Sequence, residues 1–360
     1  MGLKSMLANS SRMVFALVIS ATLVTGCSKG LEYKRSRIAA PPPAPTEPPP
    51  PTSEPEPTPT PSTAFLSLPK SEAKYVNEDS NVVIENLQFT NVTGIAIYIK
   101  YSKNVTIKNC FFNKATEEAI NIERSTNIRI ENCLFNGTET GVYAMESQLI
   151  KVINNQFINV RRRIGQGRGQ FVQLNGVTGP GNVVENNQGE NFFGESDPED
   201  LISIFKSSGT VDSPISIRNN TFRGGGPSSS GGGIMTGDYG GNYIIVENNT
   251  LVDPGQYGIA TAGGTNITII NNKIYGKQQS FTNNPLYVWG QTGVTCSNIN
   301  VKGNRANWID KNGYNNLGWN AGNCTSTAFE LPTPITLEEM NVPAHLITKI
   351  TPAELLEIRK

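Results

Sequence analysis

The chain has 360 residues, with 30 lysines and arginines and 30 aspartates and glutamates, so its formal net charge at neutral pH is zero. Nucleic-acid-binding proteins usually carry an excess of positive charge, and this balance, without a recognised binding motif, argues against that class. The single histidine argues against a zinc site, because zinc centres draw on several histidine and cysteine ligands.

The first 26 residues are predicted to form a secretion signal. An apolar run over residues 14–24 follows basic residues and is too short for a membrane-spanning helix. It ends in Leu-Val-Thr-Gly-Cys at residues 23–27, which resembles a bacterial lipobox. The resemblance implies that Cys27 is the lipidated first residue of the mature protein. Ser28, which follows the cysteine where an Asp could stand, resembles the residue found in lipoproteins that are sorted to the outer membrane. An ordinary signal peptide with an incidental cysteine is the alternative.

Residues 27–63 are predicted to form a disordered stalk on that lipid anchor. Twelve of the 23 prolines fall between residues 41 and 63, among Thr, Glu and Ser. Such a segment cannot bury a core and favours extended polyproline II. At ~3.1 Å per residue it would reach on the order of 65 Å. We therefore predict a protein held at the outer membrane or cell surface, with the membrane as a partner through Cys27.

A repeated phrase of alternating apolar and polar residues, ending in asparagine, occupies residues 64–328. The asparagine stands at Asn86, Asn109, Asn132, Asn154, Asn186, Asn219, Asn248 and Asn271, with Gly303 in a ninth copy. The intervals between the asparagines are 23, 23, 22, 32, 33, 29 and 23 residues. A period near 23 residues with alternating β-branched positions predicts a stacked solenoid.

Each repeat is predicted to contain two aligned strands. Val105 and Ile107 should point inward, with Thr106 between them pointing outward. The asparagine after this strand tolerates left-handed backbone, so it should stand at a turn, and stacked copies should form an amide ladder. A second strand aligns residues 96–103 with residues 119–126. Equivalent strands should pair in parallel, ~4.8 Å apart.

This pattern resembles the right-handed parallel β-helix of the pectate-lyase type. The resemblance covers roughly residues 75–325 and implies an all-β solenoid of about nine coils. Residues 329–360 form the tail, in which Thr351 and the two residues after Pro352 read as a helix start. We predict a capping helix over Pro352–Ile358 that covers the open end of the solenoid.

Four cysteines lie in or next to the repeats. Cys110 and Cys133 occupy the same slot in adjacent repeats, so they should stack, either as a disulfide or as unpaired interior residues. Cys296 and Cys324 lie 28 residues apart, and a disulfide there would fasten the C-terminal end in an oxidising compartment.

Three consecutive long intervals predict loops that cluster on one surface and wall a groove. The first of these inserts carries Arg161, Arg162, Arg163 and Arg168. Arginine binds carboxylates and sulfates through two parallel hydrogen bonds, so the insert favours an acidic polysaccharide as ligand. A solvated loop is the alternative.

The second insert leads into a strand with a candidate base. Glu199 and Asp200 precede it, and its Lys206 aligns with Asp238 of the next coil, which predicts a separation of ~5 Å. A lysine in this setting could remove the C5 proton of a uronate, which requires a neutral amine favoured by burial or neighbouring arginines. An ion pair that braces two coils is the alternative.

The same strand has a weak resemblance to lyases of the alginate-lyase and chondroitinase-B type. In that group a Glu precedes a Ser-containing strand with a Lys, as Glu199, Ser203 and Lys206 do here, and an Arg-His-Gly phrase follows about one coil later. Here only Arg223 and the glycine after it match, without the histidine. The resemblance implies that calcium is a possible cofactor, because that group uses it to neutralise the substrate carboxylate.

Together these features predict a monomeric polysaccharide lyase that acts by β-elimination, with no cofactor required by the sequence. Lys206 would be the base, Asp238 would orient it, and Arg223, Glu199 and Asp200 would act with the insert arginines on the substrate. Because a fold does not determine a function, three alternatives stay open. They are a non-catalytic carbohydrate-binding or scaffold protein, a uronate epimerase, and a glycoside hydrolase with paired carboxylates.

Overall fold

The computed structural model describes residues 65–162, 168–228 and 230–360 of the chain. The predicted signal peptide (residues 1–26), the stalk (residues 27–63) with Cys27, and Arg163 lie outside the described residues. Within the described ranges, no helix is both long enough and apolar enough to span a bilayer.

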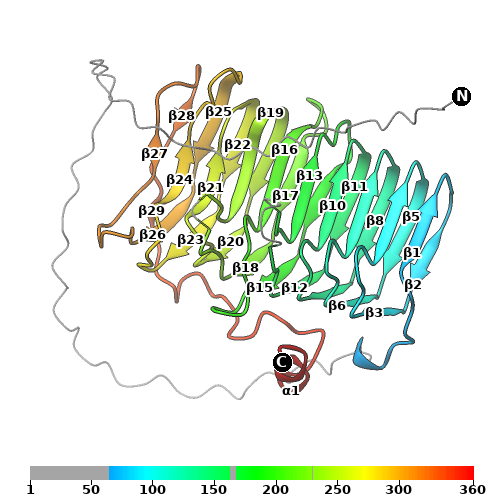
Figure 1. The fold of residues 1–360 in the computed structure, drawn as a ribbon. Helices are drawn as coiled ribbons and strands as arrows, with labels where there is room; N and C mark the ends of the chain where they lie inside the picture. The colour runs from blue at the N-terminus through cyan, green and yellow to red at the C-terminus, as the bar shows by residue number, and fades with distance from the viewer. Residues whose placement is uncertain (1–64, 163–167, 229) are drawn as a thin grey trace, which may run out of the picture. The chain divides into compact units, whose positions relative to one another are not determined.

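The described chain forms the predicted right-handed parallel β-helix, with three sheets that run side by side along a solenoid (Figure 1). One sheet, S3, has 10 strands, and a further 19 strands form two ladders, S1 and S2, that share β19. Each ladder therefore also has ten strands, and each coil contributes one strand to every sheet. All pairings between coils are parallel, because every coil runs in the same direction.

The strand bounds are as follows. S1 consists of β1 (Lys74–Asn77), β4 (Ile97–Lys100), β7 (Ile120–Glu123), β10 (Val142–Met145), β13 (Val172–Asn175), β16 (Ile202–Ser208), β19 (Ile234–Glu247), β21 (Tyr257–Thr261), β24 (Asn284–Val288) and β27 (Trp319–Asn320). S2 consists of β2 (Val83–Glu85), β5 (Lys103–Lys108), β8 (Thr126–Glu131), β11 (Gln148–Ile153), β14 (Val183–Glu185), β17 (Ile215–Arg218), the later part of β19, β22 (Gly264–Ile270), β25 (Cys296–Lys302) and β28 (Ala328–Phe329). S3 consists of β3 (Gln88–Thr90), β6 (Phe111–Asn113), β9 (Leu134–Asn136), β12 (Gln156–Ile158), β15 (Gln188–Glu190), β18 (Thr221–Arg223), β20 (Thr250–Val252), β23 (Lys273–Gly276), β26 (Arg305–Trp308) and β29 (Thr333–Pro334).

The structure has one coil more than the asparagine phrases indicate. β27, β28 and β29 build a tenth coil and pair with β24, β25 and β26. These three strands have two residues each, too few to show an alternating pattern in the sequence. The repeat consequently continues to Pro334, past the predicted end of the solenoid.

The predicted inward positions form the core. Val105 and Ile107 are fully buried, and Thr106 between them is half-exposed. Behind S3, phenylalanine rings from successive coils stack with centroids 4.7–5.1 Å apart: Phe89, Phe112, Phe135, Phe157 and Phe171. Phe171 comes from the segment before β13 and fills the space over Gly189, where any Cβ would lie 2.5 Å from its ring. A glycine in β15 thus keeps the aromatic stack continuous.

The recurring asparagines stand at turns with left-handed backbone, as predicted. All eight have φ between 54° and 57°, and Gly303 has φ 64°. Their side chains form a ladder in the first coils, where Asn109 donates to Asn86 and Asn132 donates to Asn109. Because this conformation is costly for most L-residues, whereas asparagine tolerates it and glycine adopts it freely, the turn explains why asparagine or glycine recurs at this position.

A second, buried amide ladder occupies the slot directly after these turns. It contains Asn155, Asn187, Asn220, Asn249, Asn272 and Asn304, each donating to the next at 2.9–3.1 Å. The same slot holds Cys110 and Cys133 in earlier coils, and both are buried and unpaired. The ladder satisfies polar groups inside a dry core.

We expect Asn220→Ala to lower the free energy of unfolding by about 1–3 kcal/mol, the cost of buried polar groups left without partners. Asn220 accepts from the Asn187 backbone N–H at 3.0 Å and donates to the Val184 carbonyl at 3.0 Å. Urea unfolding of both proteins measures the change. Asn300→Ala, on the half-exposed outer side of β25, is the control and should be nearly neutral. Equal losses in the two variants would contradict the role of the ladder.

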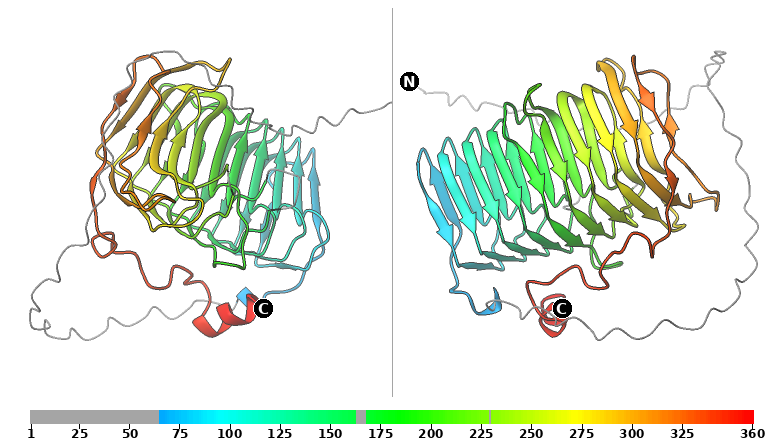
Figure 2. Two further views of the ribbon diagram at one scale, coloured as in Figure 1. Left: turned by 60° about the vertical axis from the view of Figure 1, so that its left-hand side comes forward. Right: turned by 180° about the vertical axis from the view of Figure 1, so that it is seen from behind.

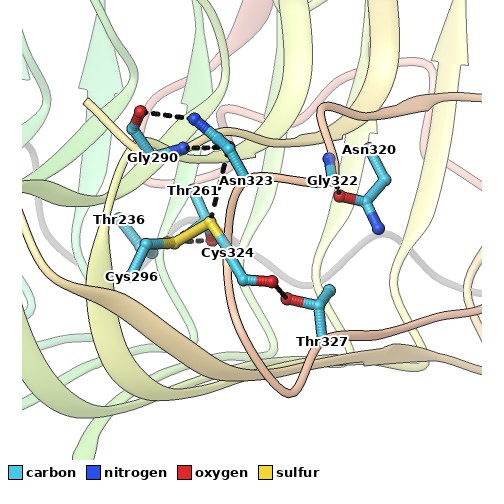
Figure 3. Close-up of a disulfide and its surroundings, with 9 residues drawn as sticks. All are labelled: Thr236, Thr261, Gly290, Cys296, Asn320, Gly322, Asn323, Cys324 and Thr327. Atoms are coloured by element: carbon cyan, nitrogen blue, oxygen red, sulfur yellow. Dashed lines mark hydrogen bonds between the residues drawn. A yellow bond between two sulfur atoms is a disulfide. The ribbon is translucent and has the colours of Figure 1, made fainter. Parts of the chain in front are cut away.

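The predicted disulfide between Cys296 and Cys324 is present at the C-terminal end of the solenoid (Figure 3). It joins the start of β25 to the segment between β27 and β28, so it ties the ninth coil to the tenth.

The predicted helix α1 (Pro352–Ile358) is present with its Thr351 capping box, but it does not cover an end of the solenoid. Its Leu355 and Ile358 pack against the outer side of β6, β9 and β12, in one cluster with Phe111, Leu134 and Ile158. Figures 1 and 2 show the helix on the flank of the solenoid. These outward positions on S3 are apolar, and burying them favours the flank over the end. The short 3-10 helix η1 (Phe65–Ser67) joins the same cluster.

Candidate functional site

The candidate site lies on the outer side of S1, where β16, β19, β21, β24 and β27 lie side by side (Figure 1). Strand pairing places one outward column across these coils: Ser203, Met235, Ala260, Tyr287 and Trp319. Ser203, Met235 and Ala260 are buried although they point away from the core. Met235 and Ala260 pack in one cluster with Tyr257 and the partly buried Tyr287.

Lys206 is displaced by one residue along β16 from the position opposite Asp238 that the alignment predicted. An irregularity in the pairing of β16 with β19 sets Phe205, not Lys206, opposite Asp238. Lys206 has φ 50° and is exposed, and its Nζ lies 5.1 Å from the ring centre of Phe205 and 5.4 Å from that of Tyr239. Burial of the amine, one of the two conditions proposed to favour its neutral form, is therefore not found. Alignment columns assume regular pairing, and a bulge of this kind breaks the assumption.

Asp238 lies on β19, three residues after Met235 and opposite Phe205, and is half-buried. Burial raises the pKa of its carboxyl, while a hydrogen bond from Gln291, a bond from its neighbour's backbone and the charge of Lys206 act in the opposite direction. The Gln291 Nε2 donates to Oδ1 at 2.8 Å. Lys206 and Asp238 are thus electrostatically linked, although the described ion pairs do not include this one.

Asp200 is a buried carboxyl at the start of β16. Burial raises its pKa to about 8, the charge of Glu199 adds to the increase, and hydrogen bonds from Tyr257 and Gly232 oppose it. Both bonds go to Oδ1, from the Tyr257 hydroxyl and, at 3.0 Å, from the Gly232 backbone N–H. Asp200 is therefore largely protonated at neutral pH, when a carboxyl can donate a proton.

Tyr287 links the two carboxyls. Burial raises the pKa of its hydroxyl, and the charges of Asp200 and Asp238 raise it further, so the ring lies within electrostatic reach of both. Tyr257 and Tyr287 pack edge to face with centroids 5.3 Å apart. The two tyrosines and two aspartates thus form one cluster that spans the sixth to ninth coils.

Glu199 is held by an adjacent polar network. It accepts hydrogen bonds from Ser228 at 2.8 Å and from Ser230, and it forms an ion pair with Arg162. Both carboxylate oxygens therefore have protein partners. This network positions the loop that precedes β19 against the start of β16.

The insert arginines that the structure describes are mostly committed to protein carboxylates. Arg162 pairs with Asp197 at 3.3 Å as well as with Glu199. Arg168 pairs with Glu118, and its guanidinium lies 4.4 Å from the ring centre of Tyr143, which is only 3% exposed. Arg161 is exposed, and its backbone bridges to Asp197. Two of the three insert arginines in the described residues, Arg162 and Arg168, are thus neutralised by carboxylates of the protein itself.

Arg223 is not brought to this cluster. It lies on β18 in S3, a different sheet from Lys206, and pairs with Glu190 at 2.9 Å. Its guanidinium also donates to the carbonyls of Pro343 at 2.7 Å and Ala344 at 3.0 Å. Arg223 therefore fastens the C-terminal tail to the outside of S3.

Sequence reasoning did not single out Tyr257, Tyr287 or Gln291. Tyr287 lies within the aligned second strands, but only the pairing of β24 with β21 shows that it stands opposite Ala260 in the outward column. Gln291 lies in the loop after β24, where insertions interrupt the alignment, so no column could relate it to Asp238.

The cluster of two aspartates and two tyrosines coincides neither with a metal-binding group nor with a surface hollow among the described residues. The described residues contain no group of three or more His, Cys, Asp or Glu side chains arranged to hold a metal ion. Two hollows found in the described chain lie elsewhere, one beside β1 and β2 near Tyr75 and Val83, and one on S2 near Tyr243 and Asn298.

Comparison with known proteins agrees with the fold. The family described as "Right handed beta helix region" matches residues 70–211. No curated protein sequence matches the chain significantly.

Three solved structures are similar to the chain at low sequence identity. The catalytic domain of a GH87 alpha-1,3-glucanase in complex with nigerose is 17% identical, with a TM-score of 0.48 over 70% of this chain and 49% of that one. The surface adhesin PfbA of Streptococcus pneumoniae is 17% identical, with a TM-score of 0.42 over 68% and 65%. The tailspike protein of E. coli bacteriophage HK620, in complex with a pentasaccharide, is 12% identical, with a TM-score of 0.39 over 70% and 53%. The chain spans about half the length of the glucanase chain.

Proposed function

We propose that the protein binds and cleaves a polysaccharide on the outer side of S1, with Asp200 and Asp238 as the reacting carboxyls. The observation that carries the proposal is the burial of Asp200, which raises the pKa of its carboxyl to about 8, within electrostatic reach of the half-buried carboxyl of Asp238. Two carboxyls held in different environments are the usual means by which glycosidases separate acid and base roles.

Hydrolysis is the reaction that this pair supports best. Asp200 would give its proton to the glycosidic oxygen as the bond to the anomeric carbon breaks. Asp238 would take a proton from the water whose oxygen forms the new bond to that carbon. Tyr257 would hold Asp200 in position through the hydrogen bond to Oδ1. Proton exchange with solvent would then restore both carboxyls.

β-Elimination from an acidic polysaccharide, with Lys206 as base, is the second candidate. It is favoured by two observations. The exposed Lys206 interacts electrostatically with Asp238, and Asp200 offers a proton donor for the leaving oxygen. We rank it below hydrolysis because Arg162 and Arg168, which would hold a uronate carboxylate, already pair with Glu199 and Glu118.

One assay separates the two reactions. The full-length protein in detergent is incubated with a panel of neutral and uronate-containing polysaccharides, following both new reducing ends and the absorbance of unsaturated uronate. Reducing ends without the chromophore indicate hydrolysis. The chromophore, lost in Lys206→Ala, indicates elimination with Lys206 as base. If no polymer is shortened, cleavage is excluded for that panel, and binding without cleavage, or epimerisation, takes its place.

We further propose that the protein acts at the outer membrane or cell surface, anchored through a lipidated Cys27. This proposal rests on the sequence, in which an apolar run is followed by a lipobox-like phrase and then by a proline-rich segment. In cells fed radiolabelled palmitate, the native protein should carry label and sediment with membranes. Cys27→Ala should carry no label and leave the membrane fraction. Labelled, membrane-bound Cys27→Ala protein would contradict the anchor.

A further inference from the structure

The carboxylate of Asp238 is held by a residue from two coils further along the chain. The Gln291 Nε2 donates to Asp238 Oδ1 at 2.8 Å, and the Gln291 Oε1 accepts from the Tyr239 backbone N–H at 2.8 Å. The amide therefore contacts both the carboxylate and the backbone directly after it. This two-point contact fixes the direction of the Asp238 side chain more firmly than a single bond would.

Gln291 itself depends on the loop between β24 and β25. Its backbone N–H donates to the Ala262 carbonyl at 3.1 Å, and its carbonyl accepts from Val294 at 3.0 Å. One residue earlier, Gly290 exchanges two hydrogen bonds with the Asn323 side chain. The Gly290 N–H donates to Oδ1 at 2.9 Å, and Nδ2 donates to the Gly290 carbonyl at 2.8 Å.

The disulfide fixes Asn323 in turn. Asn323 directly precedes Cys324, which is bonded to Cys296 at the start of β25 (Figure 3). A Cβ on Gly290 would lie 3.1 Å from the Cys296 Cβ and 3.5 Å from the Cys324 Sγ, so the loop rests directly on the disulfide. A continuous series of contacts thus leads from the disulfide through Asn323 and Gly290 to Gln291 and Asp238.

We propose that Gln291 is a positioning residue for Asp238 and that the Cys296–Cys324 disulfide holds it there through Asn323 and Gly290. The proposal rests on the proposed function only in the role that it gives to Asp238. The disulfide would then do more than fasten the last coil: it would set the environment of a reacting carboxyl on the outer side of S1.

The test measures the pKa of the Asp238 carboxyl by NMR in the full-length protein labelled with carbon-13 aspartate. In Gln291→Leu we expect this pKa to rise, because the hydrogen bond that favours the charged form is lost while burial remains. Lys206, Asp200 and Tyr287, the titratable groups that interact electrostatically with Asp238, are unchanged in this variant. Gln278→Leu is the matched control, since its amide donates only to the Lys311 carbonyl at 3.1 Å, and should leave the pKa unchanged.

Two further variants test the disulfide. The double variant Cys296→Ser/Cys324→Ser should raise the Asp238 pKa in the same direction as Gln291→Leu, and combining all three changes should add nothing beyond Gln291→Leu. Asn323→Ala leaves the disulfide intact but cuts the link to Gly290, so it should give the same rise even if the double variant fails to fold. A wild-type pKa in folded Asn323→Ala would overturn the coupling.

The same measurement separates this inference from the proposed function, because it requires no substrate. If the variants leave the Asp238 pKa unchanged but the native protein cleaves a polysaccharide, the coupling is wrong and the proposed function stands. If the variants raise the Asp238 pKa but the native protein cleaves no polysaccharide, the coupling stands and the proposed function is wrong.

Discussion

Asp200→Asn should lower the rate of polysaccharide cleavage by roughly 10²–10⁴-fold, the range that a positioned proton donor contributes. Asparagine keeps the carbonyl-type Oδ1 that accepts from Tyr257 and Gly232, so the local geometry should persist. What it removes is the transferable proton. The change should therefore appear in kcat with the fold intact, and a circular dichroism spectrum identical to that of the native protein would confirm the second point.

The pH dependence of the native enzyme provides a check on the same assignment. Asp200 must be protonated to act as an acid, so the rate should fall as pH rises through about 8. Asp238 must be ionised to act as a base, so the rate should also fall at low pH, and the profile should be bell-shaped. Asp212→Asn, an exposed aspartate in the loop after β16, is the control and should keep both rate and profile. A rate near the native one in folded Asp200→Asn would exclude Asp200 as the proton donor.

The fold was predictable because its rules are local and repeat in every coil. Asn109 and its equivalents need left-handed backbone, and Val105 and Ile107 need a dry interior, so each coil carries its own turn and its own alternation. The capping box of α1 is local too, and the sequence located it correctly. The surface against which α1 packs is not determined by the local sequence. It depends on apolar outward residues of S3, such as Leu134, which lie more than 200 positions away in the sequence.

The candidate site was less predictable because it depends on irregular contacts. Column alignment identified Lys206 and Asp238 as near neighbours, but the irregular pairing of β16 with β19 moved Lys206 by one position. Alignment also could not show that Arg162 and Arg168 are committed to Glu199 and Glu118, since those ion pairs form between loops and strands of different coils. Burial of Asp200 beneath Tyr257, the property that most affects its chemistry, arises only when three coils stack.

Asp200→Asn should also stabilise the protein, and the gain should increase with pH. The pKa of Asp200 is about 8 in the folded protein, against an ordinary value of 3.8. Between these values the folded state binds one proton more than the unfolded state, so the native protein loses stability as pH rises, by roughly 1.4 kcal/mol per pH unit. Below pH 3.8 the penalty is absent, and above about 8 it is constant.

Asparagine does not titrate, so the difference in free energy of unfolding between variant and native protein should grow over this window, on the order of 5 kcal/mol in total. Urea unfolding at pH 4, 6 and 8 measures it, and a pH-independent difference would show that Asp200 has an ordinary pKa in the folded state. A buried acid retained at this cost in stability is the pattern expected of a functional group, because active sites commonly sacrifice stability for reactivity. A variant that is both more stable and less active would therefore support the assignment of Asp200 better than either result alone.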